Sequence, residues 1–284
     1  MSTNLSPAFE TLFASEVHQA YQGARALQGV ARMREGVVGS SVKFPKLASG
    51  TSSIRNPQSD VVPLNVASEL IEVSISNYIA AEYSDIFDNQ KVSYDERSEL
   101  STMLGNAIAR RETQVLIDAL EAGSPATTVA NTVVTSGSAG ASDLNVGKIL
   151  AAKKGLDAKN VPPTDRHLII HANSLSSLLA DERAISSDFQ TIKALVAGEV
   201  NTFLGMQVHV LGDMTEGGIV KDGSNDRFCF AIHKSSLACA VGMAAKTEIN
   251  YIPEKTSFLV SAMYAAGAGT IDVNGQVSIV CRES

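Results

Sequence analysis

Two histidines of the segment HLIIH, His167 and His171, lie four residues apart on a predicted strand. Side chains at this spacing share one face of a strand, so the pair could offer two ligands to a metal ion. A structural zinc site needs four ligands, and no cysteine, aspartate or glutamate accompanies the pair at ligand spacing. We therefore interpret both residues as core or solvated histidines and expect no metal ion.

The glycine-rich segment GSAGASD, residues 137–143, precedes a predicted helix, as a phosphate-binding loop does. It lacks the G-K-[ST] ending of a P-loop and the G-x-G-x-x-G of a dinucleotide-binding turn. We interpret it as part of a flexible linker, residues 124–142, in which Ser142 caps the following helix. No cofactor is expected.

The remaining catalytic signatures are weak. The sequence contains neither G-x-S-x-G nor H-E-x-x-H. Of the three cysteines, Cys229, Cys239 and Cys281, the first two lie in apolar surroundings, which indicates inert core thiols. The carboxylates between Asp85 and Glu99 approach or open a predicted helix, whose dipole stabilises acidic groups at its N-terminus. We predict that the protein is not an enzyme.

The composition of the chain limits the other classes of function that are open to it. The chain has 284 residues, 44% of them hydrophobic, and a net charge of -7 from 23 basic and 30 acidic residues. The apolar fraction excludes intrinsic disorder as the main state. The acidic balance argues against a protein that grips phosphates, though not against one that surrounds nucleic acid. No stretch approaches the roughly 20 apolar residues of a transmembrane helix, so no membrane partner is expected.

The sequence of the first quarter of the chain predicts a long helix followed by a long β-hairpin. Apolar residues at helical spacing predict an amphipathic helix over residues 7–33. Alternating residues predict strands over 37–47 and 61–76, joined by the polar tip 48–60. The outer part of this long hairpin has too few apolar residues for its own core, and an isolated hairpin is marginal in water. We therefore expect that part to rest on another chain.

Residues 94–121 give the strongest helical pattern, opened by a predicted capping box of Ser93 and Glu96. About 28 residues at 1.5 Å each would make a rod of roughly 42 Å. The rest of the chain mixes helices and strands without a βαβ rhythm, which favours an α+β fold. Elements that reach beyond their own core are typical of interlocking assemblies of identical copies.

Three segments, in this order along the chain, resemble the major capsid proteins of tailed bacteriophages with the HK97-like fold. They are TDRHLIIHANSLSSLLADERAISSDF, VAGEVNTFLGMQVHVLGDM and FCFAIHKSSLACAVG. The resemblance implies an N-terminal arm, an extended β-hairpin loop, a peripheral domain with a long spine helix, and an axial domain. It places them at residues 1–35 (arm), 36–80 (extended loop), 81–139 and 246–284 (peripheral domain, spine helix 94–121), and 140–245 (axial domain).

The resemblance also implies a function. Hexamers and pentamers of the chain would form an icosahedral head around double-stranded DNA, in a virion assembled in the cytoplasm of a bacterial host. The implied partners are further copies of the chain, a portal protein and a separate scaffolding protein, with decoration proteins left open. Two alternatives stay open here: an encapsulin-like compartment shell, and a soluble α+β enzyme with an unrecognised site.

The assembly contacts are expected on the arm, the hairpin and the long helix. In relatives that crosslink, a lysine of the extended loop joins an asparagine of a neighbour, but no motif identifies such an asparagine here. We therefore expect non-covalent contacts, with ion pairs at the hairpin that set register more than strength. The candidate contact residues are Phe9, Phe13, Lys43, Lys46, Arg55, Asp60, Arg110 and Arg111.

Overall fold

The computed structural model describes residues 26–27, 29–52, 54–58, 60–61, 63–89, 95–135, 140–180 and 202–283. Phe9, Phe13 and most of the predicted helix 7–33 lie outside these residues. The described end of the predicted helix is not helical. Gly29 has a φ of +80°, and Arg32–Arg34 form strand β1, which pairs parallel with β10. The prediction was wrong there because pairing with a distant strand overrides the local period.

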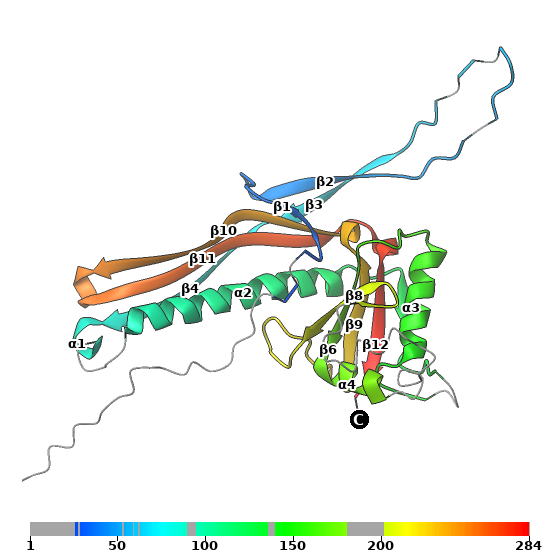
Figure 1. The fold of residues 1–284 in the computed structure, drawn as a ribbon. Coiled ribbons are helices and arrows are strands. Elements are labelled where there is room, and N and C mark those ends of the chain that lie inside the picture. The colour runs from blue at the N-terminus through cyan, green and yellow to red at the C-terminus, as the bar shows by residue number, and fades with distance from the viewer. Residues whose placement is uncertain are drawn as a thin grey trace, which may run out of the picture.

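A long four-stranded sheet carries the helix α2 along one face (Figure 1). The strand order is β1, β10 (Leu237–Ile252), β11 (Ser257–Thr270) and β4 (Ser76–Asp85). The short helix α1, Ile86–Asn89, follows β4, and the 3-10 turn Pro253–Lys255 joins β10 to β11. Apolar side chains of α2 pack on inward-facing residues of β11, such as Val260 and Tyr264.

Helix α2 spans Glu96–Ala122, close to the predicted 94–121, and 27 residues at about 1.5 Å each give ~40 Å. The predicted capping box is not formed. Asp95 is the N-cap and its side chain makes no capping bond, and the Glu96 carboxylate accepts a hydrogen bond from Ser84 Oγ at 2.7 Å. The Glu96 side chain therefore links the start of α2 to β4. Ser93 lies outside the described residues.

A six-stranded mixed sheet forms the other half of the molecule. Its order is β5 (Thr127–Val129), β12 (Gln276–Arg282), β9 (Asp226–His233), β6 (Arg166–His171), β8 (Met206–Leu211) and β7 (Thr202–Phe203). Helices α3 (Val146–Ala158) and α4 (Ala172–Ala180) cover one face through a second core cluster. Ile169, Leu211 and Phe230 belong to the cluster around α2, so this helix joins the two sheets. The α+β class is confirmed.

Two local expectations differ from the structure. Strand β12 falls within the range 246–284 expected for the peripheral domain, but it pairs with β9 and β5 in the six-stranded sheet. The cap of α3 is Asn145, whose side chain accepts from Lys148 N, and not Ser142. Ser142 donates its hydroxyl to the Asn131 carbonyl at 3.3 Å, because the end of the linker folds back on the segment around Asn131.

The predicted hairpin is present as β2 (Ser41–Leu47) paired with β3 (Ser68–Ser74). Its base packs on the face of the four-stranded sheet away from α2: Val42, Phe44 and Val73 contact Ala238 and Ala240. The predicted alternation is confirmed, since Val42 and Phe44 are buried and Lys43 is exposed. Among the described residues, no helix is long and apolar enough to cross a membrane.

Candidate assembly interface

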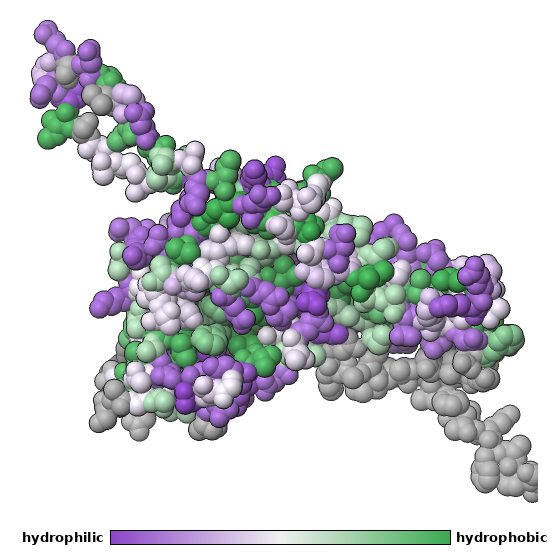
Figure 2. Space-filling view, turned by 180° about the vertical axis from the view of Figure 1, so that it is seen from behind, coloured by the Kyte–Doolittle hydropathy of each residue, from purple (hydrophilic) through white to green (hydrophobic). Residues whose placement is uncertain are grey.

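The hairpin beyond its packed base exposes a series of large apolar side chains. Between Ala48 and Ala67, whose backbones are joined by a 3.0 Å hydrogen bond, the described chain forms no strand. Ile54 is 96% exposed, Val61 78% and Leu47 72%, and Leu64, Val66 and Leu70 are exposed as well. Figure 2 shows these hydrophobic residues along a projection that leaves the body of the molecule. A surface of this kind marks an interaction site.

The hairpin points away from the far end of its own long sheet. In Figure 1 the β10–β11 turn lies at one end of the molecule, and the hairpin tip reaches past the six-stranded sheet at the other end. The tip and the far end of the long sheet therefore lie at opposite ends of the described part of the chain.

The far end of the long sheet also exposes apolar side chains, with Ile79 and Tyr83 on one face of the sheet and Ile249 and Tyr251 on the other. Ile79 is 69% exposed and Phe87 65%, and Tyr83, Ile249 and Tyr251 are also exposed. Cations lie over two of the neighbouring rings: Lys255 Nζ is 4.1 Å from the centre of the Tyr83 ring, and Arg97 stacks on Phe258. Lys255 and Arg97 thus hold the Tyr83 and Phe258 rings in place.

The same end of the long sheet also has an open edge. β1 covers β10 only from Ala238 to Ala240, and the register of β10 shifts twice between Val241 and Lys246. From Met243 to Ile252 the outer edge of β10 has no strand partner among the described residues. The Lys246–Glu248 ion pair and the register shifts guard this edge against indiscriminate pairing.

The predicted contact residues fall into two groups. Lys46 pairs with Asp272 of its own chain at 3.2 Å, and Arg111 pairs with Glu216 at 2.8 Å while stacking on Tyr78. These two side chains fix the hairpin base and the loop before β9 within one subunit, an intrachain role that the sequence did not reveal.

As contacts between subunits, Lys46, Arg111 and the other candidates all remain predictions. Lys43, Arg55 and Asp60 are exposed, and no ion pair joins Arg55 to Asp60 in the part of the chain that the structure describes. Arg110 is half-buried, with its backbone carbonyl close to Gly217.

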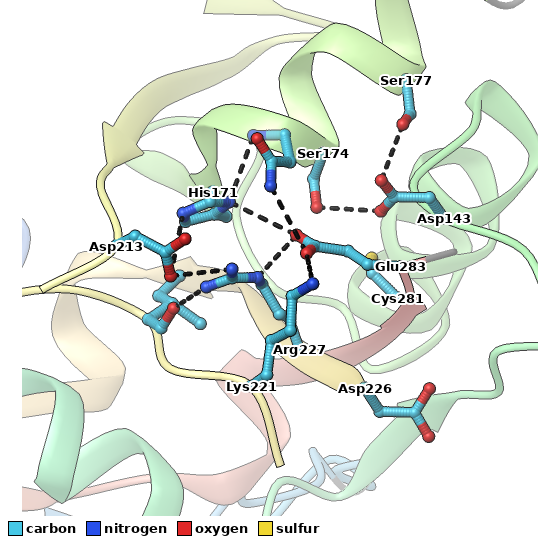
Figure 3. A network of polar contacts seen from close by, with 12 residues as sticks. Asp143, His171, Ser174, Ser177, Asp213, Lys221, Asp226, Arg227, Cys281 and Glu283 are labelled. Carbon is cyan, nitrogen blue, oxygen red and sulfur yellow. Dashed lines mark hydrogen bonds and ion pairs between the residues drawn. The ribbon is translucent and has the colours of Figure 1, made fainter. Parts of the chain in front are cut away.

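A polar network lies at one end of the six-stranded sheet (Figure 3). The fully buried Arg227 guanidinium donates from Nε to Glu283 Oε1 at 2.5 Å, pairs with Asp213 at 2.8 Å, and reaches the Ile219 carbonyl. Lys221 Nζ lies 2.6 Å from Glu283 Oε2, and His171 Nδ1 lies 3.4 Å from Glu283 Oε1. The network ties the last described residue to the loop between β8 and β9.

The electrostatics of the network favour charged carboxylates and a neutral histidine. Burial opposes ionisation of Glu283, but hydrogen bonds from Lys221, Arg227 and Asn173 outweigh it and hold the pKa of Glu283 below its usual value. Burial and the Arg227 charge lower the pKa of His171. His171 Nδ1 already accepts from the Asn173 backbone N–H, and Nε2 faces Asp213 at 3.9 Å. No described serine or cysteine side chain is hydrogen-bonded to the His171 ring, so the group resembles a structural ion network more than a catalytic triad.

Two further buried polar groups strengthen the same end of the sheet. Arg282 pairs with Asp226 through two of its nitrogens, Nε and Nη2. Lys148 Nζ donates to the Ser142 and Val280 carbonyls, and burial lowers its pKa. The sequence analysis missed these groups because their partners are far apart in the chain. One signal was present: charged pairs, Asp226–Arg227 and Arg282–Glu283, flank two apolar strands.

The two histidines of HLIIH have separate partners. His167 Nδ1 is 3.1 Å from His209 Nε2, while His171 belongs to the network around Glu283. Among the described residues no group of three histidine, cysteine or acidic side chains is arranged to hold a metal ion.

Comparisons with known proteins agree on one class of protein. The family model described as "Phage capsid protein" matches residues 5–283. No curated protein matches the sequence. Among solved structures, the head of Helicobacter pylori bacteriophage KHP40 is 11% identical, with a TM-score of 0.78 over 99% of this chain and 98% of that chain. The capsid of cyanophage P-SCSP1u is 18% identical, with a TM-score of 0.75 over 100% and 96%. Mycobacterium phage Che8 is 17% identical, with a TM-score of 0.70 over 98% of each chain.

Proposed function

The chain belongs to the phage capsid protein family, and we propose that it is the major capsid protein of a tailed phage. Its copies form hexamers and pentamers that tile an icosahedral head around double-stranded DNA. The observation that carries the proposal is the apolar surface that one subunit leaves uncovered on the hairpin and on the far end of the long sheet. Identical copies supply the missing cover.

The two uncovered surfaces fit a head-to-tail contact. The hairpin tip projects from one end of the subunit, and the exposed aromatic and aliphatic residues lie at the opposite end (Figure 1). In a ring of copies, the tip of one subunit covers the far end of the long sheet of the next. Each buried Å² contributes about 25 cal/mol, so many small contacts sum to a stable shell while each stays weak enough for error correction.

The strand pairing supports a domain assignment. We assign residues 1–35 to the N-terminal arm, 36–80 to the extended loop, the rest of the four-stranded sheet with α2 to the peripheral domain, and the six-stranded sheet to the axial domain. This moves β5 and β12 into the axial domain and the whole of β10 into the peripheral domain, relative to boundaries at 81–139, 140–245 and 246–284. The loop between β8 and β9 then belongs to the axial domain.

The charge of the chain suits a wall around packaged DNA. A net charge of -7 repels phosphates, so the shell encloses DNA without binding its sequence. We further propose a portal protein and a separate scaffolding protein as partners, and assembly in the cytoplasm of the bacterial host before the protein resides in the virion. Neither alternative, a compartment shell or a soluble enzyme, is favoured by the family match.

Negative-stain electron microscopy of the purified full chain tests the proposal. We expect rings of five or six subunits, tubes or closed shells. The number of these particles should rise when a scaffolding protein is added. A population of single compact subunits under all assembly conditions would overturn the proposed function.

A further inference from the structure

A chain of hydrogen bonds connects two strands of the six-stranded sheet to the start of the described chain. His167 on β6 and His209 on β8 approach with Nδ1 and Nε2 at 3.1 Å and ring centres at 5.3 Å. The Ala26 backbone lies close enough to the His209 ring to favour its protonated form, and Ala26 packs against the core cluster around α2. Three segments that are distant in sequence therefore meet at one pair of rings.

The contacts of the two rings indicate which ring nitrogens carry the protons. The Ala26 backbone contact favours a proton on His209, so we assign Ala26 as the acceptor, through its carbonyl oxygen, and His209 as the donor. A neutral imidazole has a single N–H, so Nε2 of His209 is left as an acceptor and Nδ1 of His167 donates to it. Nε2 of His167 is then a buried lone pair, and it has no hydrogen-bond partner among the described residues.

The segment held by this chain is packed against the long helix. Leu27, Val30 and Ala31 are buried in the cluster that contains Leu104 and Ile108 of α2. The same segment leads directly into β1, which pairs with β10. The histidine pair therefore links the six-stranded sheet to the segment that enters the four-stranded sheet.

An additional proton is unfavourable on either of the two ring nitrogens that lack one. On Nε2 of His167 it would create a buried N–H without an acceptor, and on Nε2 of His209 it would remove the acceptor of the His167 bond. Burial, His209, Lys234 and His233 oppose a charge on His167, and only Asp165 favours it, so the pKa of His167 falls to about 4. Burial lowers the pKa of His209 as well, against the favourable contact with Ala26.

We propose that the chain His167–His209–Ala26 is an acid-sensitive latch, which holds the N-terminal segment against the six-stranded sheet while both rings are neutral. When either ring takes up a proton, the bond between the rings or the packing around them is lost, and residues 26–31 separate from the sheet. The latch is a property of the single subunit and does not depend on shell assembly.

Hydrogen exchange on the unassembled full chain tests the latch. We compare protection at pH 7 and pH 4, corrected for the intrinsic exchange rate, in peptides covering residues 26–34 and, as a reference, β11. If opening returns His167 to an ordinary pKa near 6.5, protection of residues 26–34 falls by on the order of 100-fold at pH 4. Protection of β11 changes far less.

The double variant His167→Asn, His209→Gln keeps groups that donate and accept but cannot titrate in this range. We expect its protection over residues 26–34 to be equal at pH 7 and pH 4, while His233→Gln, a histidine outside the chain of bonds whose charge opposes protonation of His167, still loses protection at pH 4, by a smaller factor than the wild type. If the double variant does not fold, nitrogen NMR of the wild-type rings must show His167 or His209 titrating in step with the loss of protection. Equal loss in β11 and in residues 26–34, titration of neither ring, or an unchanged acid response of the folded double variant would overturn the latch.

Discussion

Glu283→Gln is expected to be the most destabilising conservative change at the end of the six-stranded sheet. The substitution keeps the shape of the side chain but removes the charge that faces Arg227, Lys221 and His171. Arg227 is fully buried and, within the described chain, keeps Asp213, which is largely exposed, as its ionic partner. Breaking a buried pair costs about 3–5 kcal/mol, and the oxygen that glutamine retains reduces this to about 2–3 kcal/mol.

Urea unfolding of the unassembled chain measures the effect. At pH 7 we expect the midpoint to fall with an unchanged slope, which identifies a change in stability and not in compactness. Lys221→Met is the matched control, because it removes the more exposed partner of the same carboxylate and should cost less than about 1 kcal/mol.

The pH dependence of this variant gives a second check. The pKa of Glu283 is lower in the folded chain than its ordinary value of 4.5, so its stabilisation is present above that value and is lost as the pH falls below it. The difference between wild type and Glu283→Gln should therefore shrink below pH 4.5. A difference under about 0.5 kcal/mol at pH 7, or one that grows on acidification, would refute the role of the network.

Two further substitutions test how the hairpin is held to the body. Phe44→Ala empties a buried position between the hairpin and the long sheet, and it should cost about 3–5 kcal/mol in urea unfolding; a cost below about 1 kcal/mol would contradict the observed packing. Gly267→Ala places a methyl group against the Ser74 carbonyl where β11 meets the hairpin, and it should lower the melting temperature by several degrees, whereas Gly105→Ala, in open space on α2, should leave the melting temperature unchanged or raise it.

Much of the fold could be predicted from local patterns. The helical period placed α2 to within about two residues, and the alternation of Val42, Lys43 and Phe44 gave the packed face of the hairpin. The first half of β10, from Leu237 to Lys246, could not be predicted in this way. Its residues are mostly small, without alternation, and they form a strand because equally small residues of β11 lie opposite them.

The polar network could not be predicted from the sequence for a different reason. His171, Arg227 and Glu283 belong to three strands or their ends, and only the order of the six-stranded sheet brings them together. The same holds for Lys46 and Arg111, which the sequence offered as contacts between subunits and which pair within one subunit. Charge and exposure can be estimated from sequence, but the choice of partner requires the tertiary structure.

Sedimentation velocity of hairpin-tip variants under assembly conditions tests the central claim most directly. Deletion of residues 48–60, and Ile54→Asp as a point change at a 96% exposed apolar position, should leave a folded subunit that forms no stable particles. Thr51→Asp adds the same charge at an exposed polar position of the tip and should assemble like the wild type. Normal particles from the deletion and from Ile54→Asp would contradict the claim that other copies cover the exposed apolar hairpin.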